Sequence, residues 1–248
     1  MSTKLNQHGL SRDIPDSVKR QVRRACGFGC VVCGGSIIEY EHVDPEFHDA
    51  EVHDPERIAL LCPRCHAKVT RAFLSKDTVK GAMAAPFCKK TGYASELLDI
   101  GKAHPKVVFA GVTLMNCLIP IEVKGVPLFE IKAAEEPGAP FRLSASFANS
   151  RGEPSLEIVD NEWRVYGANW DAEAVGGAIT IRDNPGHVSL RLVANPPDGV
   201  SIEELDMYLA GFRFLGSPGE LTVQMPGGGA GRFTRCVLDN CRIGLSLG

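Results

Sequence analysis

The chain lacks the apolar segments that mark secreted and membrane-spanning proteins. Its 248 residues begin with a polar stretch that has no apolar core of a signal peptide. The longest apolar run, 107–123, is interrupted by Gly111, Asn116 and Pro120, which favours two buried strands over a membrane helix. Low-complexity tracts and internal repeats are also missing. We therefore expect a globular protein of one large domain or two ordinary ones, with no membrane partner.

A strong net charge is missing as well, because the formal charge is −3 at pH 7. The whole-chain charge therefore does not indicate a nucleic-acid binder. Basic residues nevertheless cluster in the first hundred positions, where they would either contact phosphates or form solvated helix faces. These clusters are Lys19, Arg20, Arg23 and Arg24, then Arg64, Lys68 and Arg71, then Lys89 and Lys90.

Nine cysteines are present, but their spacing is unlike that of a disulfide framework. Four of them form two Cys-x-x-Cys pairs, which is a spacing typical of metal sites. The other five lie scattered in apolar or turn surroundings, as ordinary buried thiols do. This usage is typical of a reducing compartment, and we expect a cytoplasmic protein. The scattered cysteines are Cys26, Cys88, Cys117, Cys236 and Cys241.

The two Cys-x-x-Cys pairs predict a structural zinc site. Cys30 and Cys33 form the first pair, Cys62 and Cys65 form the second, and 28 residues separate the pairs. This spacing lets both turns close on one tetrahedral ion. So short a segment has little core of its own, so the metal would contribute folding free energy directly. A redox Cys-x-x-Cys motif is the rival interpretation, but it needs only one pair.

Three residues near these pairs are suited to hydrolysis: Glu41, His42 and His66. His66 directly follows Cys65, so the second zinc turn fixes its backbone. Glu41 and His42 are consecutive in a predicted strand at 37–42, so their side chains point to opposite faces. Glu41 suits a hard cation such as Mg²⁺, and His66 as a second ligand would also admit Mn²⁺ or Ni²⁺. His42 would act as the base that deprotonates a water.

The segments RRACGFGCVVCG, EYEHVDP and IALLCPRCHAK together resemble the HNH endonuclease family and its ββα-metal fold. The resemblance covers residues 14–76. It implies cleavage of double-stranded DNA with a divalent cation, with His42 as the general base. Glu41 would be the acidic ligand and His66 the last histidine of the family name. A bacterial or phage setting, in restriction or anti-phage defence, is also implied.

One position departs from that family's pattern. The middle asparagine normally lies five residues before the third cysteine, and this chain has Arg57 there. Arginine cannot bind a cation, so Arg57 would hold the scissile phosphate or brace the loop that presents the base. His53, four residues earlier, is a candidate replacement ligand. The alternative is a catalytically degenerate zinc module in a DNA-binding, protein-binding or structural protein.

The N-terminal third is expected to have three parts. Residues 1–13 are predicted to be a disordered lead, and residues 14–76 the ββα-metal domain, which contains helices near 16–26 and 65–76. Residues 77–105 are predicted to be a linker with a short helix at 95–102. The expected fold class of the whole chain is α+β.

Residues 106–248 carry many short β-branched and aromatic segments between Pro- and Gly-rich turns. This pattern predicts a mostly antiparallel β-sandwich or jelly roll, with a helical or irregular insertion at 201–207. We find no family resemblance here. Trp163 and Trp170 favour a core role over ligand stacking, and the glycine-rich stretch 226–232 is a weak phosphate-loop signal. A sensing, targeting or oligomerising role is expected, with an activating ligand, a partner or a second copy as candidates.

Overall fold

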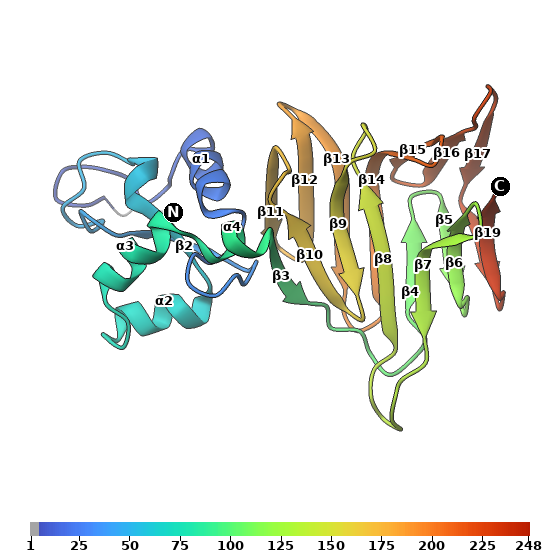
Figure 1. The fold of residues 1–248 in the computed structure, drawn as a ribbon, viewed down its shortest axis with the longest axis horizontal. Coiled ribbons are helices and arrows are strands. Elements are labelled where there is room, and N and C mark those ends of the chain that lie inside the picture. The colour runs from blue at the N-terminus through green and yellow to red at the C-terminus, as the bar shows by residue number, and fades with distance from the viewer. Residues whose placement is uncertain (1–4) are drawn as a thin grey trace. The chain divides into compact units, whose positions relative to one another are not determined.

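The computed structural model describes residues 5–248, which fold into two compact units (Figure 1). Within these residues all helices belong to the first unit, and the second is built from strands. Unit 1 consists of the chain up to Glu96 together with Val165–Glu173. Unit 2 consists of Leu97–Arg164 and Ala174–Gly248. None of the helices within residues 5–248 is long and apolar enough to cross a membrane.

Unit 1 begins with a helix, a hairpin and a second helix. Helix α1, Asp16–Cys26, ends where Gly27 adopts a left-handed φ of 75° and its N–H returns to the last turn. Strand β1, Glu39–His42, pairs antiparallel with β2, Ile58–Leu61. Helix α2, Pro63–Thr70, follows β2 almost directly. All four residues of β2 are buried, so this strand forms the centre of the unit's core.

Residues 77–105, which we expected to be a linker, are largely structured. Helix α3, Lys76–Ala84, begins at Ser75, whose side chain accepts a hydrogen bond from the N–H of Thr78. Helix α4, Phe87–Thr91, follows. Strand β3, Tyr93–Leu97, occupies the place of the helix expected at 95–102. Strand pairing outweighs local helix propensity there, with Ala94 fully buried on one face.

The N-terminal residues also differ from the expected disordered lead at 1–13. The side-chain amide of Asn6 donates to the carbonyls of Phe47 and Ala50, each at 2.6 Å. Its side-chain oxygen accepts from the backbone N–H groups of His8 and Leu10. One asparagine therefore hydrogen-bonds both to the backbone of its own turn and to a loop about 40 residues away in sequence. Amino-acid composition does not reveal such a contact. Residues 1–4 lie outside the described part of the chain.

The first sheet has the strand order β19-β6-β7-β8-β9-β10-β3. From β6 to β9 each strand pairs antiparallel with the next, and β19 runs parallel to β6. Its further strands are β6 (Ile119–Val123), β7 (Val126–Lys132), β8 (Arg142–Ala148), β9 (Pro154–Val159), β10 (Glu162–Tyr166) and β19 (Ile243–Leu247).

The second sheet runs from β11 to β17 in sequence order, and β4 extends it by pairing parallel with β14. Strand β5 pairs with β4, and β18 pairs parallel with β5. The strands are β4 (Lys106–Phe109), β5 (Val112–Met115), β11 (Asp171–Val175), β12 (Ala178–Asn184), β13 (His187–Asn195), β14 (Gly199–Leu209), β15 (Phe212–Ser217), β16 (Glu220–Gln224), β17 (Ala230–Thr234) and β18 (Cys236–Asp239).

Three buried phenylalanines join the two sheets of unit 2. The ring of Phe109 on β4 lies edge-on to Phe129 on β7, with centroids 5.8 Å apart. It also lies edge-on to Phe214 on β15, at 6.4 Å. Because Phe129 belongs to the first sheet and the other two to the second, the sheets pack face to face through an aromatic core.

One sequence expectation in unit 2 is corrected. The insertion expected at 201–207 lies inside the single strand β14. Arg191 of β13 pairs with Glu204, and the next residue, Leu192, pairs with Ile202, so Glu203 is an unpaired β-bulge. This extra residue interrupts the alternation of buried and exposed side chains along β14, which made the segment look irregular in the sequence. The glycine-rich stretch 226–232, a weak phosphate-loop signal, supplies the β16–β17 hairpin turn at 226–229 and the start of β17 at 230–232. The N–H of Met225 donates to the carbonyl of Gly229 and closes the turn.

Candidate metal centre and adjoining cleft

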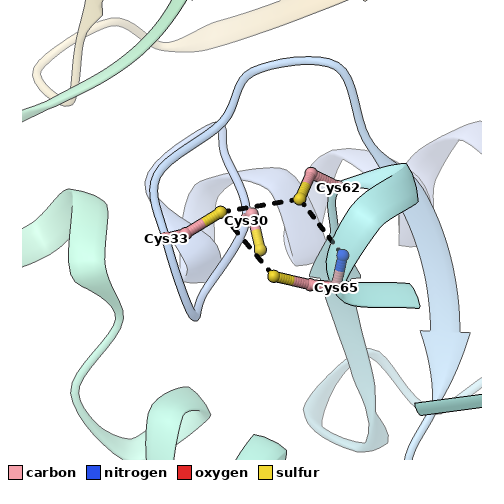
Figure 2. A group of neighbouring side chains, drawn as sticks. All are labelled: Cys30, Cys33, Cys62 and Cys65. Carbon is pink, nitrogen blue, oxygen red and sulfur yellow. Dashed lines mark hydrogen bonds between the residues drawn. The ribbon is translucent and has the colours of Figure 1, made fainter. Parts of the chain in front are cut away.

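The two Cys-x-x-Cys pairs converge on one point of unit 1 (Figure 2). The sulfurs of Cys30, Cys33, Cys62 and Cys65 all lie within 4.8 Å of one another. The sulfur of Cys33 lies 3.5 Å from that of Cys62 and 3.7 Å from that of Cys65. A tetrahedral Zn²⁺ with bonds of about 2.3 Å would hold its sulfurs roughly 3.8 Å apart. The donor set and its spacing therefore fit a structural zinc ion.

Local backbone geometry builds both turns. Cys62 caps α2, and its sulfur lies 3.4 Å from the N–H of Cys65, which donates to it. In the first turn the N–H of Gly34 donates to the carbonyl of Cys30, with Gly34 at a φ of 85°. A Cβ at Gly34 would lie 2.7 Å from the ring of Phe87, so that position requires glycine.

The thiols of this cluster differ in pKa when no cation is near. Burial raises the pKa of Cys30, and burial together with the Cys30 thiolate raises the pKa of Cys65. At Cys33, hydrogen bonds from Gly35 and the neighbouring thiols outweigh burial and lower the pKa. A bound divalent cation would favour the thiolate at every ligand, because coordination deprotonates a thiol. All nine cysteines lie within residues 5–248, and none of them is in a disulfide.

A cleft of about 710 Å³ opens beside β1 in unit 1. It brings together the three residues that the sequence singles out for hydrolysis, Glu41, His42 and His66. Its other lining residues come from the N-terminal segment, the loop after β1 and the start of α3. They are Leu5, Asn6, Arg12, Ile14, Glu39, Tyr40, Glu46, Phe47, His48 and Lys76.

Glu41 and His66 lie side by side in this cleft. The Nε2 atom of His66 is 2.9 Å from Oε2 of Glu41. The backbone N–H of His66 donates to the carbonyl of Cys62, so the cysteine turn positions the histidine. Adjacent ligands of an octahedral ion with bonds of about 2.1 Å are roughly 3.0 Å apart. The pair is therefore spaced as two neighbouring ligands of a divalent cation.

Two further residues complete the contacts of this pair. Oε2 of Glu39 lies 2.7 Å from Nδ1 of His66. The ammonium of Lys76 bonds to Oε1 of Glu41 and lies 2.7 Å from the carbonyl of His42. Sequence reasoning missed both residues. The Glu-x-Glu alternation in β1 would have indicated Glu39, whereas Lys76 comes from α3 and carries no local signal.

Within residues 5–248, only the four cysteines form a group of three or more candidate ligands that converge within 4.8 Å. A cation between Glu41 and His66 would therefore need water or substrate oxygens to complete its coordination. Mg²⁺ commonly keeps several waters in protein sites, so two protein ligands are compatible with that ion.

His42 is buried behind the same cleft. Its Nε2 atom lies 3.1 Å from Nδ1 of His53, and its ring packs edge-on against Phe47. Burial, followed by the charge of His53, lowers the pKa of His42 to about 4. The imidazole is therefore neutral at neutral pH, and it is a weaker base than a free histidine. His53, our candidate replacement ligand, contacts this ring and does not join Glu41 and His66, because the loop after β1 folds back onto His42.

Arg57 lines a different cleft, of about 420 Å³, which it shares with His42. Its side chain is largely exposed and lies 3.9 Å from Asp54, while its carbonyl accepts from the N–H of Val43. Arg57 therefore braces the loop through its backbone and not through its guanidinium. The remaining lining of this cleft is mostly acidic, which disfavours a phosphate; it comprises Asp44, Pro45, Asp49, Ala50, Glu51, Val52 and Asp54.

Part of the basic cluster on α1 has a structural role. Arg23 is 6% exposed and makes a bidentate ion pair with Asp171, at 2.8 and 2.6 Å. It also donates to the hydroxyl of Tyr40 on β1. The guanidinium of Arg20 lies 4.8 Å from the ring centre of Trp170. These two arginines therefore hold the segment Val165–Glu173, and the buried Arg23 is not available for phosphate contacts.

Comparison with known proteins finds no family model, no curated protein and no solved structure that matches this chain.

Proposed function

We propose that unit 1 is a divalent-metal-dependent endonuclease of the HNH type that hydrolyses DNA phosphodiester bonds. The observation that carries the proposal is the placement of Glu41 and His66 at 2.9 Å, in the cleft that also contains His42. A carboxylate and an imidazole at this spacing would hold Mg²⁺, Mn²⁺ or Ni²⁺.

The residues of the cleft then have distinct tasks. When bound, the cation polarises the phosphoryl group and stabilises the leaving oxygen. His42 takes a proton from the attacking water; with Nε2 held by His53, its Nδ1 is the nitrogen left for this task. Lys76 and Arg12 place positive charge at the cleft, where they attract the DNA backbone. The four cysteines, with zinc, fix the backbone that carries His66.

The proposal is tested by incubating supercoiled plasmid with the zinc-loaded protein and Mg²⁺, Mn²⁺ or Ni²⁺, each against EDTA. We expect nicked circles with at least one of these cations and none with EDTA, because Glu41 and His66 need the ion. Equal cleavage with and without EDTA would contradict the proposal. The metal content of the purified protein, measured alongside, separates the zinc from the second ion.

We also propose that unit 2 controls assembly or access to the target, in restriction or anti-phage defence within a reducing cytoplasm. A nuclease that is silent until a ligand or a second copy binds would explain the fusion of a small cleft-bearing unit to a large β unit. Mass photometry with and without a panel of nucleotides tests this, since activation by assembly would raise the measured mass.

A second function, binding without cleavage, is favoured by one observation. Arg57, which replaces the family's asparagine, lies in the acidic cleft and not beside Glu41 and His66. In that case unit 1 would be a zinc-stabilised binding module for DNA or protein. DNA binding without nicking, under every cation and candidate activator tried, would favour this function over the first.

A further inference from the structure

His66 is bracketed by two carboxylates that project from the same strand. Glu39 and Glu41 are two residues apart in β1, so their side chains share one face. Oε2 of Glu39 lies 2.7 Å from Nδ1 of His66, and Oε2 of Glu41 lies 2.9 Å from Nε2. Each ring nitrogen therefore has its own carboxylate.

The two carboxylates differ in their surroundings. The side chain of Glu41 is 18% exposed, and its second oxygen is bonded to Lys76. The side chain of Glu39 is 48% exposed, and that of His66 is 32% exposed. An ion pair with this much exposure contributes little to folding stability, typically below about 1 kcal/mol. The contact of Glu39 with Nδ1 therefore matters more for the orientation of the His66 ring than for folding stability.

We infer that Glu39 is the positioning residue of the cation site, because it accepts the Nδ1–H of His66 and keeps Nε2 turned toward Glu41 as the ligand atom. The inference rests on the function proposed above. A carboxylate behind a ligating histidine fixes the tautomer and the ring orientation, and it makes the imidazole a better donor to the metal. Glu39 would then act through His66 without touching the cation or the substrate.

The test is Mn²⁺ binding to the zinc-loaded full chain, followed by calorimetry and by the electron paramagnetic resonance signal of free Mn²⁺. Loss of a carboxylate behind a ligating histidine typically weakens metal binding about 10- to 100-fold. We expect a loss of this size for Glu39→Ala. Glu39→Gln should recover part of it, because the amide oxygen still accepts the Nδ1–H. Zinc content and thermal midpoint should not change.

Glu46→Ala is the matched control, because Glu46 lines the same cleft but lies 3.8 Å from Lys76 and not against His66. It removes the same charge and should change Mn²⁺ affinity less than threefold. Long-range ¹H–¹⁵N correlation spectra of His66 give a second readout. The proton should reside on Nδ1 in the wild type and move to Nε2 in Glu39→Ala, because Glu41 is then the only one of the two carboxylates left.

Two outcomes are distinguishable. If Glu41→Ala abolishes Mn²⁺ binding while Glu39→Ala binds as the wild type does, with an unchanged tautomer, the role of Glu39 is overturned and the cation site stands. If the wild type, Glu41→Ala and His66→Ala all bind Mn²⁺ equally or not at all, the cation site is overturned as well, and with it the proposed function.

Discussion

Glu41 interacts with two other ionisable residues of the cleft, His66 and Lys76. One of its oxygens faces His66 and the other is bonded to Lys76. In the function proposed above, the ammonium of Lys76 would compete for this carboxylate with a divalent cation. A bound cation would leave that ammonium free to attract a phosphate.

Replacing Lys76 by Met should strengthen Mn²⁺ binding and weaken DNA binding. The first effect follows from removing the competing ammonium, whose partly exposed ion pair contributes about 1 kcal/mol, or roughly a fivefold change in affinity. Lys80→Met is the matched control, since Lys80 lies on the same helix and pairs with the exposed Asp44. Calorimetry with Mn²⁺ and a DNA filter-binding assay give the two affinities. Weaker Mn²⁺ binding in Lys76→Met would contradict the competition.

His187 makes the stability of unit 2 dependent on pH. Its Nδ1 lies 2.6 Å from Asp183 and its Nε2 3.1 Å from Asp206, which also pairs with Arg213. The hydrogen bond to Asp183, against partial burial, raises the pKa of His187. Because the folded-state pKa lies above the unfolded value of about 6.5, this stabilisation is fully present below pH 6.5. It is lost as the pH rises through the folded-state pKa.

The thermal midpoint of unit 2 should therefore fall between pH 6 and pH 9, and His187→Asn should flatten this dependence. His104→Asn is the control in the same unit, since the Nδ1 of His104 lies near the carbonyl of Pro105. Calorimetric scans at several pH values measure the midpoint. A slope that is the same in wild type and His187→Asn would rule out this histidine as its source.

At the scale of elements, the two cysteine turns couple the folding of unit 1 to the position of His66 in the cleft. Cys62 caps α2, and His66 lies in the first turn of the same helix. The zinc ion would therefore hold the helix end, the histidine and the β1–β2 hairpin in one arrangement. Structural zinc contributes about 10 kcal/mol or more in small domains, which is comparable with the stability of a whole domain.

Cys65→Ser should lose zinc and unfold unit 1 while unit 2 keeps its strand structure. Cys241→Ser is the control, because that thiol is partly exposed and lies outside the cluster. Metal analysis gives the zinc content, and circular dichroism with calorimetry separates the helical and strand transitions. One zinc per chain and an unchanged midpoint in Cys65→Ser would contradict a structural role for the cluster.

The elements that sequence predicts correctly are those fixed by local spacing. The cysteine pairs converge because each turn is two residues long, and Glu41 and His42 share one strand because they are neighbours. The elements it misses are fixed by tertiary partners. Strand β3 replaces an expected helix because it pairs within a sheet, and β14 runs through an acidic bulge that resembles a break.

Within the cleft too, local spacing in the sequence predicts some residues, whereas tertiary packing places the others. Glu41, His42 and His66 follow from motif spacing, and the structure brings all three to one cleft. His53 and Arg57 were expected to complete the site, but the fold of the loop after β1 directs His53 to His42 and Arg57 to the second cleft. Lys76 reaches Glu41 only through the packing of α3, which a single sequence does not reveal.

At the scale of the whole molecule, the two units are not consecutive stretches of chain. We expected one boundary, near residue 100; the first stretch of unit 1 ends at Glu96, and the unit also contains Val165–Glu173. The buried pair of Arg23 and Asp171 anchors that segment, and Arg23 continues to Tyr40 on β1. The strand that carries Glu39 and Glu41 is therefore braced by a residue from the second half of the sequence.

Asp171→Ala should destabilise unit 1 by at most about 3–5 kcal/mol, because Arg23 stays buried and keeps only the longer ion pair with Glu173, at 3.5 Å. Replacing both partners, as Arg23→Met with Asp171→Leu, should recover most of this loss, since an apolar pair avoids the uncompensated charge. Urea unfolding monitored by helix content measures both free energies. If the double variant is no more stable than Asp171→Ala, the explanation by an unpaired charge is wrong.

The central claim, that the cleft beside β1 cuts DNA with His42 as the base, is tested most directly by plasmid nicking with His42→Ala. His48→Ala is the control, because His48 lines the same cleft and is 72% exposed. We predict a loss of about 10²- to 10⁴-fold in the nicking rate of His42→Ala, with the zinc content kept and His48→Ala cutting as the wild type does. Nicking by His42→Ala at the wild-type rate would contradict the claim.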